Sequence, residues 1–131
     1  MTNPSGVALP VGVQELFDRI YRAWADGDGA AFAADYLPDA VVAMPGVLHL
    51  DRAAVQSSMS AGFAGPLRGS RGIDEPISVR VHGDTAIVVS SAGILMPGET
   101  DLPAERRKVA TWVLTATDDG WRVAAYINTP A

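Results

Sequence analysis

The chain has 131 residues, the usual size of one domain, with 48% apolar residues and a formal net charge of −5 at neutral pH. Because the sequence contains no cysteine, disulfide frameworks, thiolate nucleophiles and cysteine metal ligands are excluded. The negative charge argues against a nucleic-acid partner, and no apolar stretch approaches the roughly 20 residues that a membrane span needs.

A short arm precedes the expected domain. Residues 1–10 contain Pro4 and Pro10 and form this N-terminal arm, and residues 11–131 form a single domain. The arm has no basic cluster followed by an apolar core, so it does not resemble a secretory signal. We therefore expect a cytoplasmic protein without a membrane partner.

Two helices are predicted at the start of the domain. Over residues 11–25 the apolar residues recur at spacings of three and four, which is one face of an amphipathic helix. They are Val13, Phe17, Ile20 and Trp24. Asp28 can cap a second helix, which carries Phe32 and Tyr36 and stops at Pro38.

A hairpin and a third helix follow. Short extended runs at 41–44 and 47–50 flank Pro45 and Gly46, a pair that favours a turn. Asp51 can cap a helix whose apolar residues lie at i, i+4 and i+8. These residues are Val55, Met59 and Phe63, before Gly65 and Pro66 end the helix.

The second half of the chain has the composition of strands. Four segments are rich in β-branched and aromatic residues: 77–81, 85–96, 106–117 and 121–128. The first two meet at a turn containing Gly83, and the last two meet at a turn containing Gly120. The four strands therefore form an antiparallel meander.

Helices followed by a meander predict an α+β fold in which the helices cover one face of a curved sheet. Ordinary side chains do not fill the wide end of such an arrangement. We therefore expect a concave, mostly apolar cavity that accepts a small molecule.

The chain after residue 11 resembles a known superfamily. Residues 21–28 (YRAWADGD) are similar to the opening of the nuclear transport factor 2 and ketosteroid isomerase superfamily. Residues 107–114 (RKVATWVL) and 120–129 are similar to the closing hairpin of the SgcJ/EcaC family, whose relatives are the SnoaL polyketide cyclases. The resemblance implies a cone-shaped fold with three helices in the N-terminal half over the concave face of a mostly antiparallel sheet.

The resemblance also allows the catalytic positions of the ketosteroid isomerases to be checked. These enzymes use a tyrosine on the first helix, an aspartate base before a proline and a protonated aspartate on a late strand. Aligned on Gly27, Pro45 and the last hairpin, the three positions hold Ile20, Met44 and Trp112. A thioether cannot accept a proton from carbon, so ketosteroid isomerase activity is not expected.

The same alignment predicts an apolar ligand pocket. The expected ligand-binding residues are Ile20, Trp24, Tyr36, Met44, His49, Met59, Phe63, Trp112 and Ala125. Ala125 shares its strand parity with Trp121 and Val123 and is expected on the pocket floor. Strict alternation places Tyr126 and Asn128 on the outer face, and a bulge would reverse this.

Three residues are candidates for acid–base chemistry. His49 lies on an alternating strand beside the expected cavity and titrates near neutrality, although a structural histidine at a strand surface is the alternative. Tyr36 could donate a phenolic hydrogen bond into the cavity. Asp74, next to Glu75, lies near the expected pocket mouth, with solvation as its alternative role. Two distant histidines do not make a metal site, and no cofactor is implied.

These observations lead to three hypotheses of function. The first is binding of a largely apolar small molecule, such as a polyketide or polyene intermediate, by an accessory protein of secondary metabolism; the resemblance supplies this class and the enediyne context. The second is a cyclase, dehydratase or isomerase that uses His49, Tyr36 or Asp74. The third is an interaction module that works through the outer sheet face. The resemblance also implies a homodimer through that face.

Overall fold

The computed structural model describes residues 7–131, so residues 1–6 of the expected N-terminal arm lie outside the described residues. The elements in chain order are α1 (Val11–Ala25), α2 (Gly29–Ala34), β1 (Tyr36–Met44), β2 (Val47–His49), α3 (Arg52–Ala64), β3 (Arg71–His82), β4 (Thr85–Leu95), the 3-10 turn η1 (Ala104–Arg106), β5 (Lys108–Thr117) and β6 (Gly120–Pro130).

The helices begin where the sequence places their caps. The side chain of Asp28 accepts a hydrogen bond from the backbone N–H of Ala31 at 3.0 Å, and that of Asp51 accepts one from Ala54 at 2.8 Å. Each bond satisfies one of the free N–H groups at the start of a helix. The predicted apolar stripe of α1 is also the face that the helix buries.

The second helix is shorter than predicted. It ends at Ala34 instead of reaching Pro38, and Tyr36 begins β1. Tyr36 lies beside Val123 of β6, and the N–H of Val123 donates to the carbonyl of Asp35 at 2.9 Å. Pairing with a strand that is distant in sequence therefore overrides the local helical pattern here.

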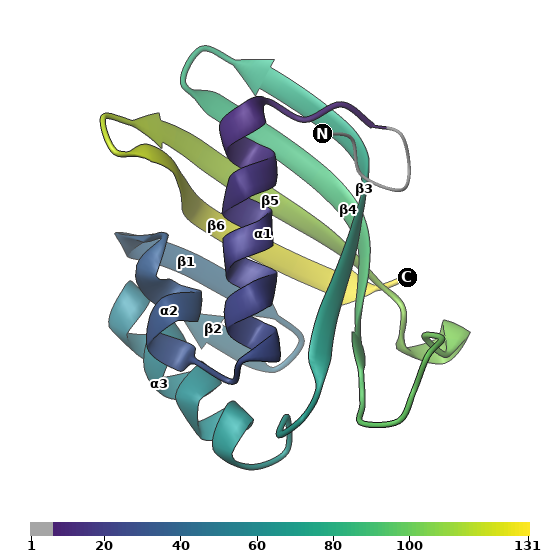
Figure 1. Ribbon diagram of the computed structural model, residues 1–131. Helices are drawn as coiled ribbons and strands as arrows, with labels where there is room; N and C mark the ends of the chain where they lie inside the picture. The colour runs from purple at the N-terminus through teal and green to yellow at the C-terminus, as the bar shows by residue number, and fades with distance from the viewer. Residues whose placement is uncertain (1–6) are drawn as a thin grey trace.

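Six strands form one mixed sheet in the order β2-β1-β6-β5-β4-β3. The predicted meander is confirmed, since β3, β4, β5 and β6 pair antiparallel in succession, whereas β1 lies parallel to β6. Figure 1 shows α1 crossing the sheet, with α2 and α3 beside β1 and β2. The first and last strands of this order do not pair, so the sheet is not closed into a barrel.

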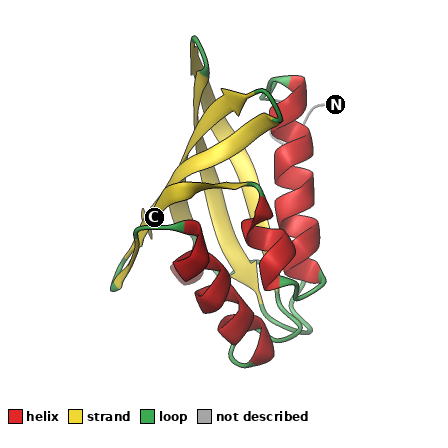
Figure 2. Ribbon diagram, turned by 90° about the vertical axis from the view of Figure 1, so that its left-hand side faces the viewer, coloured by secondary structure: helices red, strands yellow, loops and turns green. Residues whose placement is uncertain are grey.

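The helices lie along one side of the strongly curved sheet (Figure 2). The α+β fold class predicted from the sequence is therefore confirmed. The core between the layers contains the buried face of α1 and the inward-facing residues of the strands. No helix in the described part of the chain is long and apolar enough to cross a membrane.

The register of the sheet is irregular at three places in the described strands: in β1 between Tyr36 and Val41, in β3 and in β6. The irregularities in β3 and β6 are β-bulges that concern the candidate site. In β3 the register shifts between Pro76 and Ser78, so Ile77 is the extra residue. In β6, Ala125 lies opposite Val113 while Val123 lies opposite Leu114, so the residue between them is extra. A bulge changes which face the following residues occupy.

Candidate functional site

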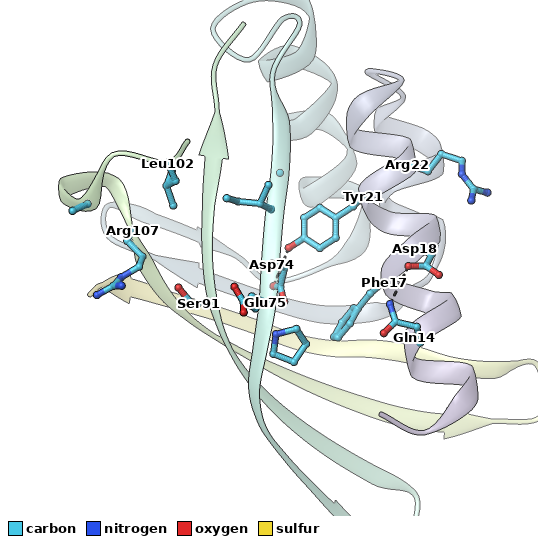
Figure 3. Close-up of a pocket in the computed structure, with 14 residues that line it drawn as sticks. Gln14, Phe17, Asp18, Tyr21, Arg22, Asp74, Glu75, Ser91, Leu102 and Arg107 are labelled. Atoms are coloured by element: carbon cyan, nitrogen blue, oxygen red, sulfur yellow. Dashed lines mark hydrogen bonds between the residues drawn. The ribbon is translucent and has the colours of Figure 1, made fainter. Parts of the chain in front are cut away.

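A groove of about 880 Å³ runs between α1 and the edge strand β3 and continues over β3 to the loop before β5. Figure 3 shows Tyr21 reaching from α1 toward Asp74, with Leu102 and Arg107 on the other side of β3. The lining residues are Gln14, Phe17, Asp18, Tyr21, Arg22, Gly72, Ile73, Asp74, Glu75, Pro76, Ser91, Leu102, Ala104 and Arg107. The part of the groove between α1 and β3 contains Asp74, an acid with a buried carboxyl.

Gly72 sets how closely α1 approaches β3. A Cβ atom at this position would lie 2.6 Å from Cε1 of Tyr21 and 3.3 Å from Cδ2 of Trp24. Separations of this kind are shorter than van der Waals contact. Only glycine therefore allows the Tyr21 ring to lie against β3, where its hydroxyl reaches Asp74.

Asp74 receives two hydrogen bonds on the same carboxyl oxygen. The hydroxyl of Tyr21 donates to Oδ2 at 3.0 Å, and the indole N–H of Trp112 donates to Oδ2 at 2.9 Å. The other oxygen, Oδ1, is buried without an aligned hydrogen-bond partner among the described residues. One oxygen thus fixes the carboxyl in place, and the other is buried beneath the surface of the groove.

Burial raises the pKa of the Asp74 carboxyl above its ordinary value. Ser90, Trp112 and Tyr21 oppose this effect because each favours the charged form. The Ser90 hydroxyl is the largest of these three opposing causes, and it acts as a hydrogen-bond donor toward the carboxylate. A carboxyl with a raised pKa can both accept and return a proton closer to neutral pH.

The phenol of Tyr21 stays protonated. Burial raises its pKa well above 10.0, and the negative charge of Asp74 is the next cause. Tyr21 therefore acts as a hydrogen-bond donor toward Asp74 and not as a base.

The β3 bulge determines where Asp74 points. Asp74 lies opposite Ala92, and Val79 lies opposite Val88; Ala92 and Val88 are both buried on the inner face of β4. Asp74 and Val79 are five positions apart, so strict alternation would place them on opposite faces. The extra residue at Ile77 allows both to face inward.

The predicted ligand-binding residues lie mostly in the core instead of the groove. Ile20, Tyr36, Phe63 and Trp112 are buried in one cluster, and Trp24, Met44 and Met59 pack against it. None of the seven lines the groove described above. Trp112 nevertheless contributes to the site, because its indole N–H holds Asp74.

His49 and Ala125 lie apart from this arrangement. His49 is a half-buried residue of the edge strand β2, opposite Val42. The β6 bulge places Ala125 opposite Val113, on the face away from Trp112 and Tyr126. The strict alternation that predicted Ala125 on the pocket floor does not hold, and Tyr126 faces inward instead.

Two site residues had no clear signal in the sequence. Tyr21 is one residue after Ile20, the residue that the sequence resemblance aligned with the isomerase tyrosine. The hydroxyl of Tyr21 reaches Asp74 on β3. Ser90 lies in an otherwise apolar alternation on β4 as its one buried hydroxyl residue, with 0% exposure. A buried polar residue within an apolar strand face is the signal that could have indicated it.

A comparison with models of known protein families identifies the family of this chain. The family model of the SnoaL-like domain matches residues 13–127. None of the curated proteins compared with the chain matches it.

Solved structures with the same fold are distant in sequence. A domain of unknown function with a cystatin-like fold from Nostoc punctiforme has a TM-score of 0.82 and 24% identity, over 92% of this chain and 76% of that one. An NTF2-like protein from Novosphingobium aromaticivorans has a TM-score of 0.78 and 23% identity, over 92% and 80%. A candidate dehydratase of the NTF2-like family from Streptomyces avermitilis has a TM-score of 0.77 and 23% identity, over 92% and 94%. At these identities the likeness concerns the fold.

Proposed function

Because the chain belongs to the SnoaL-like domain family, we propose that it binds a largely apolar small molecule between α1 and β3 and that Asp74 exchanges a proton with this molecule. The reaction class is that of an isomerase, dehydratase or cyclase. The observation that carries the proposal is the carboxyl of Asp74, in which Oδ2 accepts two hydrogen bonds and Oδ1 is buried and unpaired among the described residues.

Asp74 suits this role better than the other two acid–base candidates. Tyr36 is 2% exposed, and burial raises the pKa of its phenol, so it does not ionise near neutral pH. His49 lies on β2 at the opposite edge of the sheet from β3. Only Asp74 combines a lining position in the groove with side chains that hold its carboxyl in one orientation.

The proposed chemistry is a proton transfer at carbon or oxygen. As a carboxylate, Asp74 takes a proton from a carbon next to a carbonyl group of the bound molecule. As a carboxylic acid, it returns that proton to another carbon in an isomerisation, or to a departing hydroxyl group in a dehydration. Tyr21 and Trp112 keep their protons and orient Oδ2 throughout. Oδ1 is buried, so ligand binding has to move the side chains that cover it before the reacting atom reaches this oxygen.

The proposed ligand is mostly apolar. Phe17 of α1 lines the groove on the Asp74 side, whereas Ile73 of β3 and Leu102, on the other side of β3, line its continuation (Figure 3). Apolar burial contributes roughly 25 cal/mol per Å² to affinity. The similarity of residues 107–114 and 120–129 to the SgcJ/EcaC family favours a natural-product intermediate, such as a polyketide or polyene. The Streptomyces avermitilis protein, a candidate dehydratase, is compatible with the proposed reaction class.

A general proton-abstraction probe tests the proposal without knowledge of the natural substrate. A base removes the ring C–H proton of 5-nitrobenzisoxazole, the N–O bond breaks, and the coloured 2-cyano-4-nitrophenolate forms. We expect Asp74→Asn to reduce this rate by about 10²- to 10⁴-fold, the range for loss of a general base. His49→Ala is the matched control and should retain the wild-type rate.

The outcomes separate the hypotheses. An equal rate for the wild type and Asp74→Asn would remove Asp74 as the base. If the probe binds to both proteins without turnover, the simple binding function would be favoured instead.

A further inference from the structure

The last strand presents a phenol and an amide next to each other on the concave face. The side-chain nitrogen of Asn128 donates a hydrogen bond to the hydroxyl oxygen of Tyr126 at 2.9 Å. Oδ1 of Asn128 is buried and has no hydrogen-bond partner in the described part of the chain. Turning the amide over would move the unpaired group from oxygen to nitrogen. The Tyr126–Asn128 pair therefore contains a buried group that the protein does not satisfy.

The β6 bulge brings this pair inside. Tyr126 lies opposite Trp112 and Asn128 lies opposite Ala110, and both of these β5 residues are buried on the inner face. Without the bulge, alternation would place Ala125 and Ile127 there. Bulges often redirect side chains beside functional sites. Here the irregularity replaces two apolar side chains with two polar ones.

Trp112 connects the pair to Asp74. Its indole N–H donates to Asp74 at 2.9 Å, and its ring centroid lies 4.5 Å from that of Tyr126. Burial raises the pKa of the Tyr126 phenol, the Asn128 amide opposes this, and the charge of Asp74 adds to the rise. Asp74 and the pair thus flank the same indole ring.

On the inner face Asn128 lies beside small residues, whereas Tyr126 lies beside Trp112. In the register, Asn128 lies opposite Ala110, and Ala110 lies opposite Ser90, which is itself 0% exposed. Ser90 in this row acts on the Asp74 carboxyl, so Oδ1 of Asn128 is the polar atom of the row that lacks a partner among the described residues. Buried polar groups are normally paired with protein, water or ligand, so this amide oxygen indicates where a polar group of the ligand belongs.

We propose that the Tyr126–Asn128 pair binds a hydroxyl group of the ligand, so that the ligand is an apolar molecule oxygenated at two separate positions. One oxygenated position reacts at Asp74, and the other donates a hydrogen bond to Asn128 Oδ1 and accepts one from the Tyr126 hydroxyl. The inference rests on the proposed function, because Asp74 determines where the first position lies. Neither residue of the pair lines the groove, so the second oxygenated position of the ligand lies beyond it, on the Tyr126 side of Trp112. This adds the substrate class, because a molecule with one oxygen function engages only Asp74 or only the pair.

Two naphthols test this directly. Isothermal titration compares 2-naphthol, which has one hydroxyl, with 2,6-dihydroxynaphthalene, which has a second at the far end of the same apolar ring system. The wild type should bind the diol at least about tenfold more tightly, since a site built to pair a hydroxyl discriminates against the analogue without it. In Asn128→Leu the two affinities should become equal within about twofold.

Two conservative variants allow the inference to be tested even if Asn128→Leu does not fold. Asn128→Asp retains an acceptor oxygen and should keep part of the preference for the diol. Tyr126→Phe retains the ring and should also reduce the preference for the diol. This variant replaces Asn128→Leu if circular dichroism shows that Asn128→Leu is unfolded.

Each result has a definite meaning. Equal affinities of the wild type for the two naphthols would overturn the inference and leave proton transfer by Asp74 untouched. Failure of both naphthols to bind would remove the proposed ligand site, and this inference with it. A diol preference that persists unchanged in Asn128→Leu and Tyr126→Phe would also overturn it.

Discussion

Tyr21 on α1 and Trp112 on β5 donate hydrogen bonds to the same oxygen of Asp74, at 3.0 and 2.9 Å. The carboxyl on β3 is thereby tied both to the helix layer and to the middle of the sheet. Two donors on one oxygen favour the charged form of a buried acid and fix its orientation. The protein thus holds an acid whose two oxygens have different surroundings.

Removing one donor should raise the pKa of Asp74 further. Each bond favours the charged carboxylate, so Tyr21→Phe and Trp112→Phe should each shift its titration to higher pH. A ¹³C NMR titration of the aspartate carboxyls measures this shift. Tyr36→Phe is the control, because Tyr36 is buried and donates no hydrogen bond to Asp74 in the described structure. A shift in the control equal to that in Tyr21→Phe would contradict the prediction.

The raised pKa of Asp74 predicts a pH dependence of stability. The folded state binds the Asp74 proton more strongly than the unfolded state, so this residue's contribution to stability is greatest below the ordinary value of 3.8 and falls as pH rises through the folded pKa. Asp74→Asn removes this loss and should melt at a higher temperature than the wild type at pH 7. An effect of about 1 kcal/mol corresponds to a few degrees for a domain of this size.

Thermal melting between pH 3 and pH 8 checks this prediction. The stability advantage of Asp74→Asn should shrink as the pH falls, because the wild-type carboxyl becomes neutral. Asp101→Asn, at an exposed loop position, should follow the wild-type curve. An advantage that is constant across the pH range would show that charge burial is not its cause.

The local features of the fold could be predicted from the sequence. The apolar stripe of α1, the caps at Asp28 and Asp51 and the turn glycines act within a few residues of themselves, and the structure has them as expected. The end of α2 could not be predicted in this way. It depends on the pairing of Tyr36 with β6, which is distant in the sequence.

The candidate site was harder to predict because both of its polar parts depend on bulges. Alternation read from Val79 places Asp74 outside, and alternation read from Val123 places Tyr126 outside. One extra residue in each strand reverses these assignments, and a bulge leaves little trace in the period-two pattern. The alignment on the isomerases identified the neighbourhood of Trp112, but not the carboxyl that Trp112 holds.

Gly72 should be intolerant of even one methyl group. In Gly72→Ala the new Cβ atom would lie 2.6 Å from Cε1 of Tyr21, and overpacking of this kind costs about 1–3 kcal/mol. The cost should fall when Tyr21 is replaced by Ala, because the clashing ring is then absent. A double-mutant cycle by urea denaturation measures this coupling. Strictly additive effects would mean that the close contact between Gly72 and Tyr21 does not limit the packing of α1 on β3.

The outer face of the sheet leads to a prediction about assembly. The helices lie on the other side (Figure 2), and a row of outward-facing residues crosses the middle of the sheet. This row contains Ala43, Ile127, Thr111 and Val89, in neighbouring strands. Ile127 is 40% exposed, although apolar side chains at the centre of a broad sheet are normally covered.

We propose that a second copy of the chain covers this face in a two-fold symmetric dimer. A charge placed on such a self-complementary surface meets its own copy across the axis, so Thr111→Arg and Ile127→Arg should each convert a dimer into a monomer. Light scattering at micromolar concentration measures the mass. Gln56→Arg introduces the same side chain at an exposed position of α3 and should remain dimeric. A wild-type protein that is monomeric at micromolar concentration, with no change on dilution, would contradict the proposal and leave the groove between α1 and β3 as a site complete within one chain.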